Sequence, residues 1–441
     1  MRLVSICLLA VGLAQAAEPS RTVVIKAARM FDGKSVSAPG VVVVANGKIL
    51  GAGAGAQIPS GAETLDLGDA TLLPGFMDAH THLSGDYTDD WKQAELDHLR
   101  KTIPERTLDA LPGLRATLMA GFTTCRDLGS GDYVDVGLRN AVRSGKIVGP
   151  RMLVAVHSIG STGGHCDTTG YRFGVFGRET GVQDGVINTA DEARAAVRFN
   201  IKYGADVIKT CATGGVLSLA DDVDTPQLTQ EELNALVEEA HALRRKTAAH
   251  AHGATGAKRA IRAGIDSIEH GSFLDDEALD LMRSKGTYLI PTLMAPWWIG
   301  DRMEHGVYYP PEIAAKARLA IASINQMFRK AVAKGVKIGF GTDAAVYPHG
   351  RNAGEFALMV NLGMKPVDAL KTATSVNAEL LGVSDRLGTL EAGKLADVIA
   401  VPGDPTQDIH QTEKVFFVMK EGFVYRNDRS GGPVAKSAAT R

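Results

Sequence analysis

From residue 75 onward, short apolar segments alternate with amphipathic helical stretches, and this alternation repeats eight times. Strands alternating with helices are typical of parallel βαβ units. Eight such units predict an α/β fold of the (β/α)₈ or TIM-barrel type. The predicted strands cover residues 75–80, 123–127, 151–157, 206–212, 247–252, 267–270, 287–293 and 337–342, with helical stretches such as 190–203, 229–244 and 311–334 between them.

Both ends of the chain have β character instead. Val41 to Val44 is a β-branched run, Asn46-Gly47 is a hairpin turn signal, and apolar β-type segments return at 398–401 and 414–425. We expect residues 18–74 and 392–430 to form one discontinuous β-sandwich domain. Residues 75–391 are then the barrel, and 431–441 are a tail.

The first residues resemble a targeting segment rather than part of the fold. A positive start, an apolar run from Leu3 to Leu13 and the small-x-small sequence Ala14-Gln15-Ala16 predict a signal peptide over residues 1–17. The apolar run is shorter than the roughly 20 residues that a membrane-spanning helix needs. We therefore expect a secreted or periplasmic protein that has no membrane partner after cleavage.

Composition excludes some other classes. Hydrophobic residues make up 45% of the chain and charged residues 22%, which is typical of a globular protein, and the formal net charge is −2. A nearly neutral chain without basic runs gives no support to a nucleic-acid partner. After signal cleavage only Cys125, Cys166 and Cys211 remain, too few for a disulfide framework. Cys125 and Cys211 lie in apolar strands and are expected to be buried free thiols.

Titratable residues gather where the predicted strands end. Because the carboxyl ends of barrel strands meet on one face, these side chains are expected to converge. In the first strand, residues two apart point to the same side, so two imidazoles can reach one metal ion. The group consists of His80 and His82 on strand one, Lys209 on strand four, His250 and His252 on strand five, His270 on strand six and Asp343 after strand eight.

This group predicts a metal site. Imidazole and carboxylate suit zinc, while nickel, cobalt, iron and manganese stay open. Lys209 lies inside an apolar strand, where burying an ammonium is costly, and carbamylation by CO₂ would turn it into an anionic metal bridge. Structural zinc sites prefer cysteine-rich ligand sets, and no cysteine belongs to this group. Spacing alone does not choose between His250 and His252.

The segment Pro74-Gly75-Phe76-Met77-Asp78-Ala79-His80-Thr81-His82 resembles the first-strand motif of the amidohydrolase superfamily. The order of the other ligands resembles the binuclear pattern of that superfamily, and 388–397 resembles the closing segment of members with a β-sandwich. Within it, Gly163-Gly164-His165 and the segments 249–253 and 341–344 are similar to Xaa-Pro dipeptidases, related carboxypeptidases and ochratoxin-hydrolysing amidases.

The resemblance implies a role for each ligand. His80, His82 and Asp343 would bind the more buried metal, His250 and His270 the more exposed one, and carbamylated Lys209 would bridge both. It thus selects His250 over His252, which is left as a supporting residue. Two divalent ions, zinc first, would supply a nucleophilic hydroxide at neutral pH.

Two side chains are predicted to act on the substrate. Asp343 would pass the proton of the nucleophile to the leaving nitrogen. His165, on the loop after strand three, would donate to the carbonyl or tetrahedral oxygen. Trp297 and Trp298 offer an apolar surface for the substrate, with packing or an oligomer contact as the other reading. Arg351 and Arg126 are candidates for the substrate carboxylate.

The predicted function is metal-dependent hydrolysis of the amide bond to a carboxyl-terminal amino acid. The substrates are small-molecule amides, namely dipeptides or N-acyl amino acids, with ochratoxin A and release of phenylalanine included. Three alternatives are a cyclic-amide hydrolase of the imidazolonepropionase kind, a deaminase, and a barrel scaffold without catalysis. The resemblance also implies a homo-oligomer, with an octamer among the assemblies.

Overall fold

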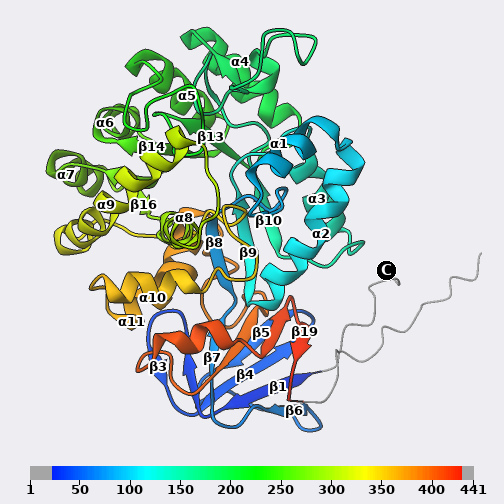
Figure 1. Cartoon of the computed structure of the whole chain (residues 1–441). Coiled ribbons are helices and arrows are strands. Elements are labelled where there is room, and N and C mark those ends of the chain that lie inside the picture. Colours follow the sequence, from blue (N-terminus) through cyan, green and yellow to red (C-terminus); the bar gives the residue numbers. More distant parts are fainter. Residues whose placement is uncertain (1–21, 430–441) are drawn as a thin grey trace, which may run out of the picture.

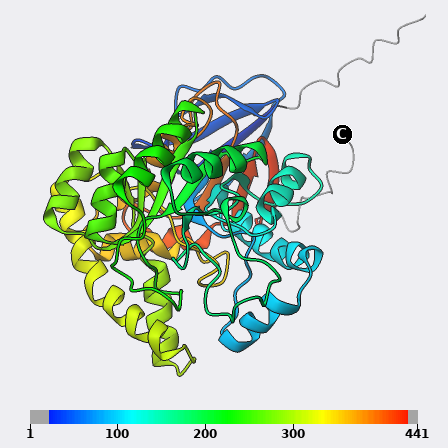
Figure 2. The ribbon, with the colours of Figure 1, turned by 90° about the horizontal axis from the view of Figure 1, so that it is seen from above.

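The computed structural model describes residues 22–429 and places parallel strands inside a ring of helices (Figures 1 and 2). Three of the strands form one sheet and four form another. The first sheet contains β8 (Phe76–Thr81), β9 (Phe122–Asp127) and β10 (Arg151–Val154). The second contains β13 (Val207–Cys211), β14 (Lys246–Gly253), β15 (Ser267–Phe273) and β16 (Tyr288–Ile290). Seven of the eight predicted strands are therefore present.

The eighth predicted strand is not regular. Residues 337–342 are joined to their neighbours at isolated points, through a parallel bridge between Leu289 and Ile338 and a hydrogen bond from Ala79 N to Phe340 O. The amide side chain of Asn377 bonds both backbone groups of Phe340, in addition to the backbone hydrogen bonds that the segment makes with Leu289 and His80. A Cβ on Gly341 would lie 2.2 Å from Ile290 Cγ2, which shows how closely this segment packs.

The helices cover the outer side of the strands, and their sequence signals agree with the structure. Helix α5 (Gln230–Ala242) starts with the predicted capping box between Thr229 and Glu232. Helix α4 (Ala190–Lys202) buries Ala193, Ala196 and Val197, as its spacing predicts. The other helices of ten or more residues in the described chain are α1 (Trp91–Arg100), α2 (Ile103–Met119), α3 (Val134–Arg143), α6 (Ala254–Ala263), α7 (Asp276–Lys285), α8 (Met294–Glu304) and α9 (Pro311–Lys334).

Strands from both ends of the described chain lie side by side below this ring (Figure 1). Strand β17 (Val398–Pro402) pairs with β7 (Ala70–Pro74) in a six-stranded sheet of order β19-β18-β17-β7-β2-β3. A second sheet has the order β5-β4-β1-β6. Side chains of both sheets, such as Ile25 and Val398, belong to one hydrophobic cluster. Strands from both terminal regions of the described chain therefore share one sheet and one hydrophobic cluster.

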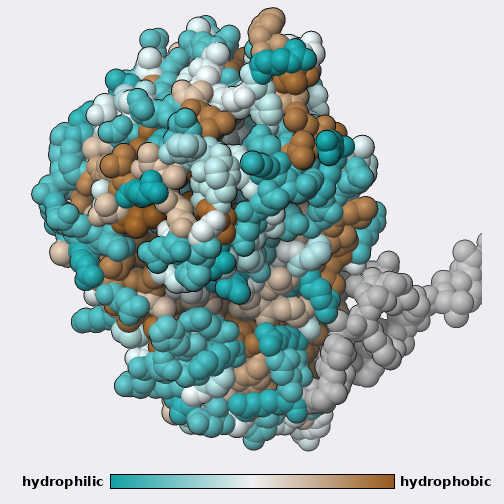
Figure 3. Space-filling model, in the orientation of Figure 1, coloured by the Kyte–Doolittle hydropathy of each residue, from teal (hydrophilic) through white to brown (hydrophobic). Residues whose placement is uncertain are grey.

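Eight further strands complete these two sheets, namely β1 (Val23–Ala27), β2 (Arg29–Phe31), β3 (Val36–Ser37), β4 (Gly40–Ala45), β5 (Lys48–Ala52), β6 (Glu63–Asp66), β18 (Phe417–Lys420) and β19 (Phe423–Asn427). The short strands β11 (Gly160–Ser161) and β12 (Val186–Ile187) pair with each other. The surface seen in Figure 3 is mostly hydrophilic, with hydrophobic side chains in scattered patches. Among residues 22–429, no helix is long and apolar enough to cross a membrane. The predicted signal peptide and tail lie outside the described residues.

Candidate metal centre and active site

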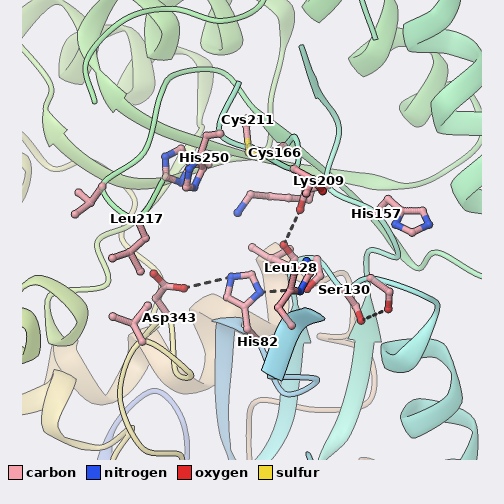
Figure 4. A pocket seen from close by; sticks show the side chains of 18 of the residues that line it. His82, Leu128, Ser130, His157, Cys166, Lys209, Cys211, Leu217, His250 and Asp343 are labelled. Carbon is pink, nitrogen blue, oxygen red and sulfur yellow. Dashed lines mark hydrogen bonds and ion pairs between the residues drawn. A yellow bond between two sulfur atoms is a disulfide. The ribbon is translucent and has the colours of Figure 1, made fainter. Parts of the chain in front are cut away.

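A cavity of about 860 Å³ lies where the parallel strands end. Its wall includes side chains from β8, β13, β14 and β15 and from the turn after residue 342. These are the predicted ligands His80, His82, Lys209, His250, His270 and Asp343, together with His252 and His165. In Figure 4, His82, Lys209, His250 and Asp343 point into one space from different sides. The convergence that the sequence predicts is therefore present.

The possible ligand atoms form two groups. In the first, the Nε2 atoms of His80 and His82 lie 3.4 and 3.3 Å from Asp343 Oδ1. In the second, His250, His252 and His270 each bring a ring nitrogen within 4.8 Å of the others. Three ligand atoms at such separations can surround one ion. The second group contains His252, which the sequence left as a supporting residue.

Each imidazole has one nitrogen fixed by a neighbour. His80 Nδ1 lies 2.7 Å from Glu269 Oε2, and His82 Nδ1 lies 3.2 Å from the carbonyl oxygen of Gly129. His270 Nδ1 lies 2.7 Å from Thr292 Oγ1. In His250 the fixed nitrogen is Nε2, which lies 3.1 Å from the carbonyl oxygen of Gly214. Metal-binding histidines typically donate their second N–H to such partners. The remaining nitrogens are Nε2 of His80, His82 and His270, and Nδ1 of His250. This pattern fits divalent metal ions.

The protonation states of His80 and Asp343 agree with ligand chemistry. For His82, burial alone would lower the pKa, but the hydrogen bond with Asp343 and the attraction to it raise the pKa above its usual value. Burial lowers the pKa of His80 to about 4, although the nearby carboxylates oppose the shift. Burial alone would raise the pKa of Asp343, but attraction to His80 and the hydrogen bond with His82 hold it well below its usual range. Neutral imidazoles and an ionised carboxylate are the forms that bind metal.

Lys209 is buried and extends into the same space (Figure 4). Its Nζ makes no hydrogen bond or ion pair with any residue from 22 to 429. Burial lowers the pKa of its amine to about 8, against the attraction of Glu269 and Asp343. A buried ammonium without a partner is costly, so the uncharged amine of Lys209 is favoured here.

Glu269 is a site residue that the sequence analysis missed. It is fully buried and accepts hydrogen bonds from Arg126 Nη2 at 3.0 Å and from Ser267 Oγ, while its other oxygen meets His80 Nδ1. Arg126 is also fully buried and donates to the carbonyl of Ala79. It therefore supports the ligand His80 and is not placed to receive a substrate carboxylate. The sequence did contain a signal for Glu269, because a charged residue stands directly before His270 inside an apolar strand.

His165 lines the cavity, and its ring packs against His250 with centroids 4.1 Å apart. Its backbone N–H donates to Gln227 Oε1 at 2.9 Å. Burial lowers the pKa of His165 to about 4, so the ring is neutral at neutral pH. His165 thus lies in the wall of the cavity that also contains the candidate ligands.

The cysteine prediction was wrong for one residue. Cys211 forms a disulfide with Cys166, across 45 residues of sequence, whereas Cys125 is the buried free thiol expected. The pairing arises because the loop after β10 returns to β13, which brings the two Cα atoms within 5.9 Å. Two cysteines on different units give no local signal of this contact. The disulfide fastens the residue next to His165 to the strand of Lys209.

We expect loss of this disulfide to destabilise the protein. A Cys166→Ser, Cys211→Ser variant should lose about 2–4 kcal/mol of unfolding free energy, because the unfolded chain is no longer restricted by the loop. Urea unfolding of the variant and the wild type measures this difference. A Cys125→Ser variant is the control, and a reductant should destabilise only proteins that hold the disulfide. Equal midpoints with and without reductant would contradict the bond.

The residues predicted to bind the apolar group and the carboxylate of the substrate are not brought to the cavity. Trp298 is buried among Tyr87, Tyr347, Arg302 and Arg351, and its Nε1 donates to Tyr87 Oη at 2.7 Å. None of Trp297, Trp298 and Arg351 lines the cavity. Helix α8 turns its residues Ala295, Pro296 and Ile299 to the cavity instead. The geometry favours the packing interpretation for Trp298, whereas Trp297 is 48% exposed.

Comparison with known proteins places the chain in a class of hydrolases. The model of the amidohydrolase family matches residues 71–426, and the chain belongs to this family. It is 34% identical to ochratoxinase of Aspergillus niger over 382 residues, which covers 82% of this chain and 76% of that protein.

Two solved structures are also similar. A Xaa-Pro dipeptidase with bound methionine in its active site is 41% identical, with a TM-score of 0.88 and coverage of 92% of this chain and 100% of the other. A prolidase in complex with N-methylphosphonate-L-proline is 28% identical, with a TM-score of 0.81 and coverage of 92% and 100%. The resemblance noted from the motifs is confirmed.

Proposed function

We propose that this protein is a metal-dependent amidohydrolase that cleaves the amide bond to a carboxyl-terminal amino acid. Its substrates are dipeptides or N-acyl amino acids, with ochratoxin A and release of phenylalanine included. The observation that carries the proposal is the convergence of four histidines, Asp343 and Lys209 on one cavity. The similarity to an ochratoxinase and to Xaa-Pro dipeptidases supports the substrate class.

Two divalent metal ions, with zinc as the first candidate, would be held by these residues. His80, His82 and Asp343 would hold one ion and His250 and His270 the other, with carbamylated Lys209 between them. His252 is an alternative ligand to His250 for the second ion, because one of its ring nitrogens lies in the same group of possible ligand atoms. When bound, such ions polarise a carbonyl and lower the pKa of water, so that hydrolysis proceeds at neutral pH.

The residues of the chain have separate tasks in this reaction. Asp343 is ionised and can take a proton from the attacking water and give it to the leaving nitrogen. Glu269 and Arg126 keep the ring of His80 in position. The disulfide at Cys166 and the bond to Gln227 hold His165 at the cavity wall.

The proposed fold class rests on membership of the amidohydrolase family. We infer that the seven parallel strands and the segment 337–342 close a (β/α)₈ barrel, and that the two terminal sheets form a β-sandwich beside it. The shared cluster of Ile25 and Val398 supports the sandwich. The signal peptide and a homo-oligomer stay proposals, which amino-terminal sequencing of the exported protein and sedimentation at micromolar concentration test.

The cavity can take a large apolar group. One wall consists of Ile299 from α8, Ala317, Ala320 and Ile324 from α9, and Leu217 from the loop after β13. Burial of a benzyl side chain on such a wall contributes roughly 1.5–3 kcal/mol. The apolar surface that the sequence assigned to Trp297 and Trp298 is therefore proposed at α8 and α9.

Arg172 is our candidate for the substrate carboxylate. Among the cations in the cavity wall, Lys101, Arg106 and Arg178 each have a carboxylate partner within residues 22–429. Arg172 has none among the described residues. A guanidinium without a partner is suited to a carboxylate.

We expect Arg172→Ala to raise KM for N-acetyl-phenylalanine about tenfold, with little change in kcat, because one charge-assisted hydrogen bond is lost at an exposed site. The primary amide of the same compound lacks the charged carboxylate and should show no such change. Arg178→Ala, on the same loop but paired with Asp184, is the matched control. A KM that rises equally for the acid and its amide would remove Arg172 from carboxylate binding.

A substrate screen tests the function itself. The purified protein, with its metal content measured, is incubated with Xaa-Pro dipeptides, N-acyl amino acids and ochratoxin A, and the released amino acid is quantified. Turnover of a ring amide such as imidazolone propionate, or of an amine, without release of any carboxyl-terminal amino acid would favour a cyclic-amide hydrolase or a deaminase. A protein that binds no metal and turns over nothing would be the non-catalytic scaffold.

A further inference from the structure

The Nδ1 atom of His165 lies at one end of a short chain of hydrogen-bonded polar side chains. His165 Nδ1 lies 2.9 Å from Ser218 Oγ, and this oxygen lies 2.6 Å from Asp221 Oδ1. Asp221 Oδ1 also accepts from Lys316 Nζ at 3.0 Å, and Oδ2 accepts from Gln227 Nε2 at 2.8 Å. Ser218 and Asp221 follow β13, whereas Lys316 comes from α9 and is itself buried.

The hydrogen atoms in this chain can be assigned by counting. Lys316, Gln227 and Ser218 all donate to Asp221, and these bonds hold the pKa of its carboxyl below the usual value although burial opposes the shift. Ser218 Oγ also lies 3.3 Å from the carbonyl oxygen of Gly215. An ionised carboxylate only accepts, so its 2.6 Å contact with Oγ requires the single hydroxyl hydrogen of Ser218, which lies between Oγ and Asp221. The contact with His165 then requires hydrogen on Nδ1. In a neutral imidazole this leaves Nε2 without hydrogen.

The position of the ring directs Nε2 toward the cavity. A Cβ on Gly215 would lie 2.1 Å from Nδ1 and 2.2 Å from Cε1, so this edge of the ring is pressed against the backbone of Gly215. His165 is part of the cavity wall, and its Nε2 has no hydrogen-bond partner in residues 22–429. The disulfide at the next residue, Cys166, restricts movement of the loop.

We propose that Ser218 and Asp221 are positioning residues that hold His165 in its Nδ1-protonated form, so that Nε2 faces the substrate cavity as a hydrogen-bond acceptor. This role differs from the donor role that the sequence suggested for His165 in the resting site. It rests on the proposed function only for the nature of the bound group, a ligand that presents a hydrogen-bond donor, such as an amide N–H. Asp221 acts through Ser218 and does not touch the ligand.

The test reads the two ring nitrogens directly. Full-length protein saturated with Zn²⁺ and labelled with ¹⁵N-histidine is measured by long-range ¹H–¹⁵N NMR, and His165→Gln identifies the signals of His165. We expect a pyrrole-like shift for Nδ1 and a pyridine-like shift for Nε2. A pyrrole-like Nε2 in the wild type overturns the proposal.

Variants separate positioning from structural support. Ser218→Ala removes the acceptor of Nδ1–H, so both nitrogens should move toward averaged shifts and kcat/KM should fall about three- to tenfold, at unchanged zinc content. Ser218→Thr keeps the hydroxyl and should restore the wild-type shifts. Asp221→Ala releases the hydroxyl hydrogen of Ser218 toward Nδ1, which should protonate Nε2, and Asp222→Ala is its neighbouring control.

Two results would contradict the mechanism: His165 shifts that stay unchanged in Ser218→Ala, or Ser218→Thr that behaves like Ser218→Ala. If Asp221→Ala does not fold because Lys316 keeps only backbone carbonyl partners, the serine variants still test the proposal. The NMR shifts are measured without substrate. A failed substrate screen would therefore overturn the proposed function, whereas the assignment of the His165 ring nitrogens would still be tested by the shifts.

Discussion

Replacing Lys209 by alanine should remove most of the bound metal and nearly all of the activity. The side chain is buried, reaches the space between the two ligand groups and has no partner in the described chain. Replacement of residues that merely support a ligand costs 10–100-fold in metal affinity or activity. Loss of a bridging anion should therefore cost at least about 100-fold. The measurements are metal content after dialysis and kcat/KM on the best substrate of the screen.

Chemical rescue sharpens the Lys209 experiment. A short-chain acid fits the space that the lysine leaves and supplies a carboxylate, so it should restore part of both metal content and activity in Lys209→Ala. Lys202→Ala, at the exposed end of α4, should keep wild-type values. If Lys209→Ala retains two metal ions and normal turnover, the bridging role is wrong.

The sequence predicts the convergence of the candidate ligands because their positions follow a rule of the fold. Side chains at the carboxyl ends of parallel strands converge whatever the helices between them contain, so His80, His250 and Asp343 could be placed together from strand positions alone. The choice between His250 and His252 depends on which ring nitrogen meets Gly214 or Ser272, and such a contact leaves no pattern in the sequence.

The missed features all depend on contacts between distant segments. Cys166 and Cys211 meet because one loop folds back on the next strand. Residues 337–342 form no regular ladder, and Asn377, on another element, bonds both backbone groups of Phe340. Trp298 points away from the cavity because Tyr87 accepts its N–H. Periodicity reports the face of an element and not the partner of a single side chain, so these positions could not be predicted.

The pair of Arg126 and Glu269 should be the most costly one to break outside the metal ligands. Both side chains are fully buried, and their charged atoms lie 3.0 Å apart. Removing one partner of a buried ion pair leaves an unpaired charge, which costs about 3–5 kcal/mol. We therefore expect Arg126→Met to lose this much unfolding free energy in urea, measured with a chelator so that metal loss does not contribute.

The pH dependence of the Arg126 variant separates charge from packing. Burial alone would raise the pKa of Glu269, but Arg126 and the hydrogen bond with His80 lower it from 4.5 to about 2. A lowered folded-state pKa contributes stability above pH 4.5 that is lost as the pH falls toward 2. In Arg126→Met this pH-dependent part should shrink, because the pKa of Glu269 is no longer held down. In Arg126→Met with Glu269→Gln the buried charge is absent, so most of the lost stability should return. An Arg126→Met protein within about 1 kcal/mol of the wild type, or a double variant no better than the single one, would show that the buried charge is not what the arginine compensates.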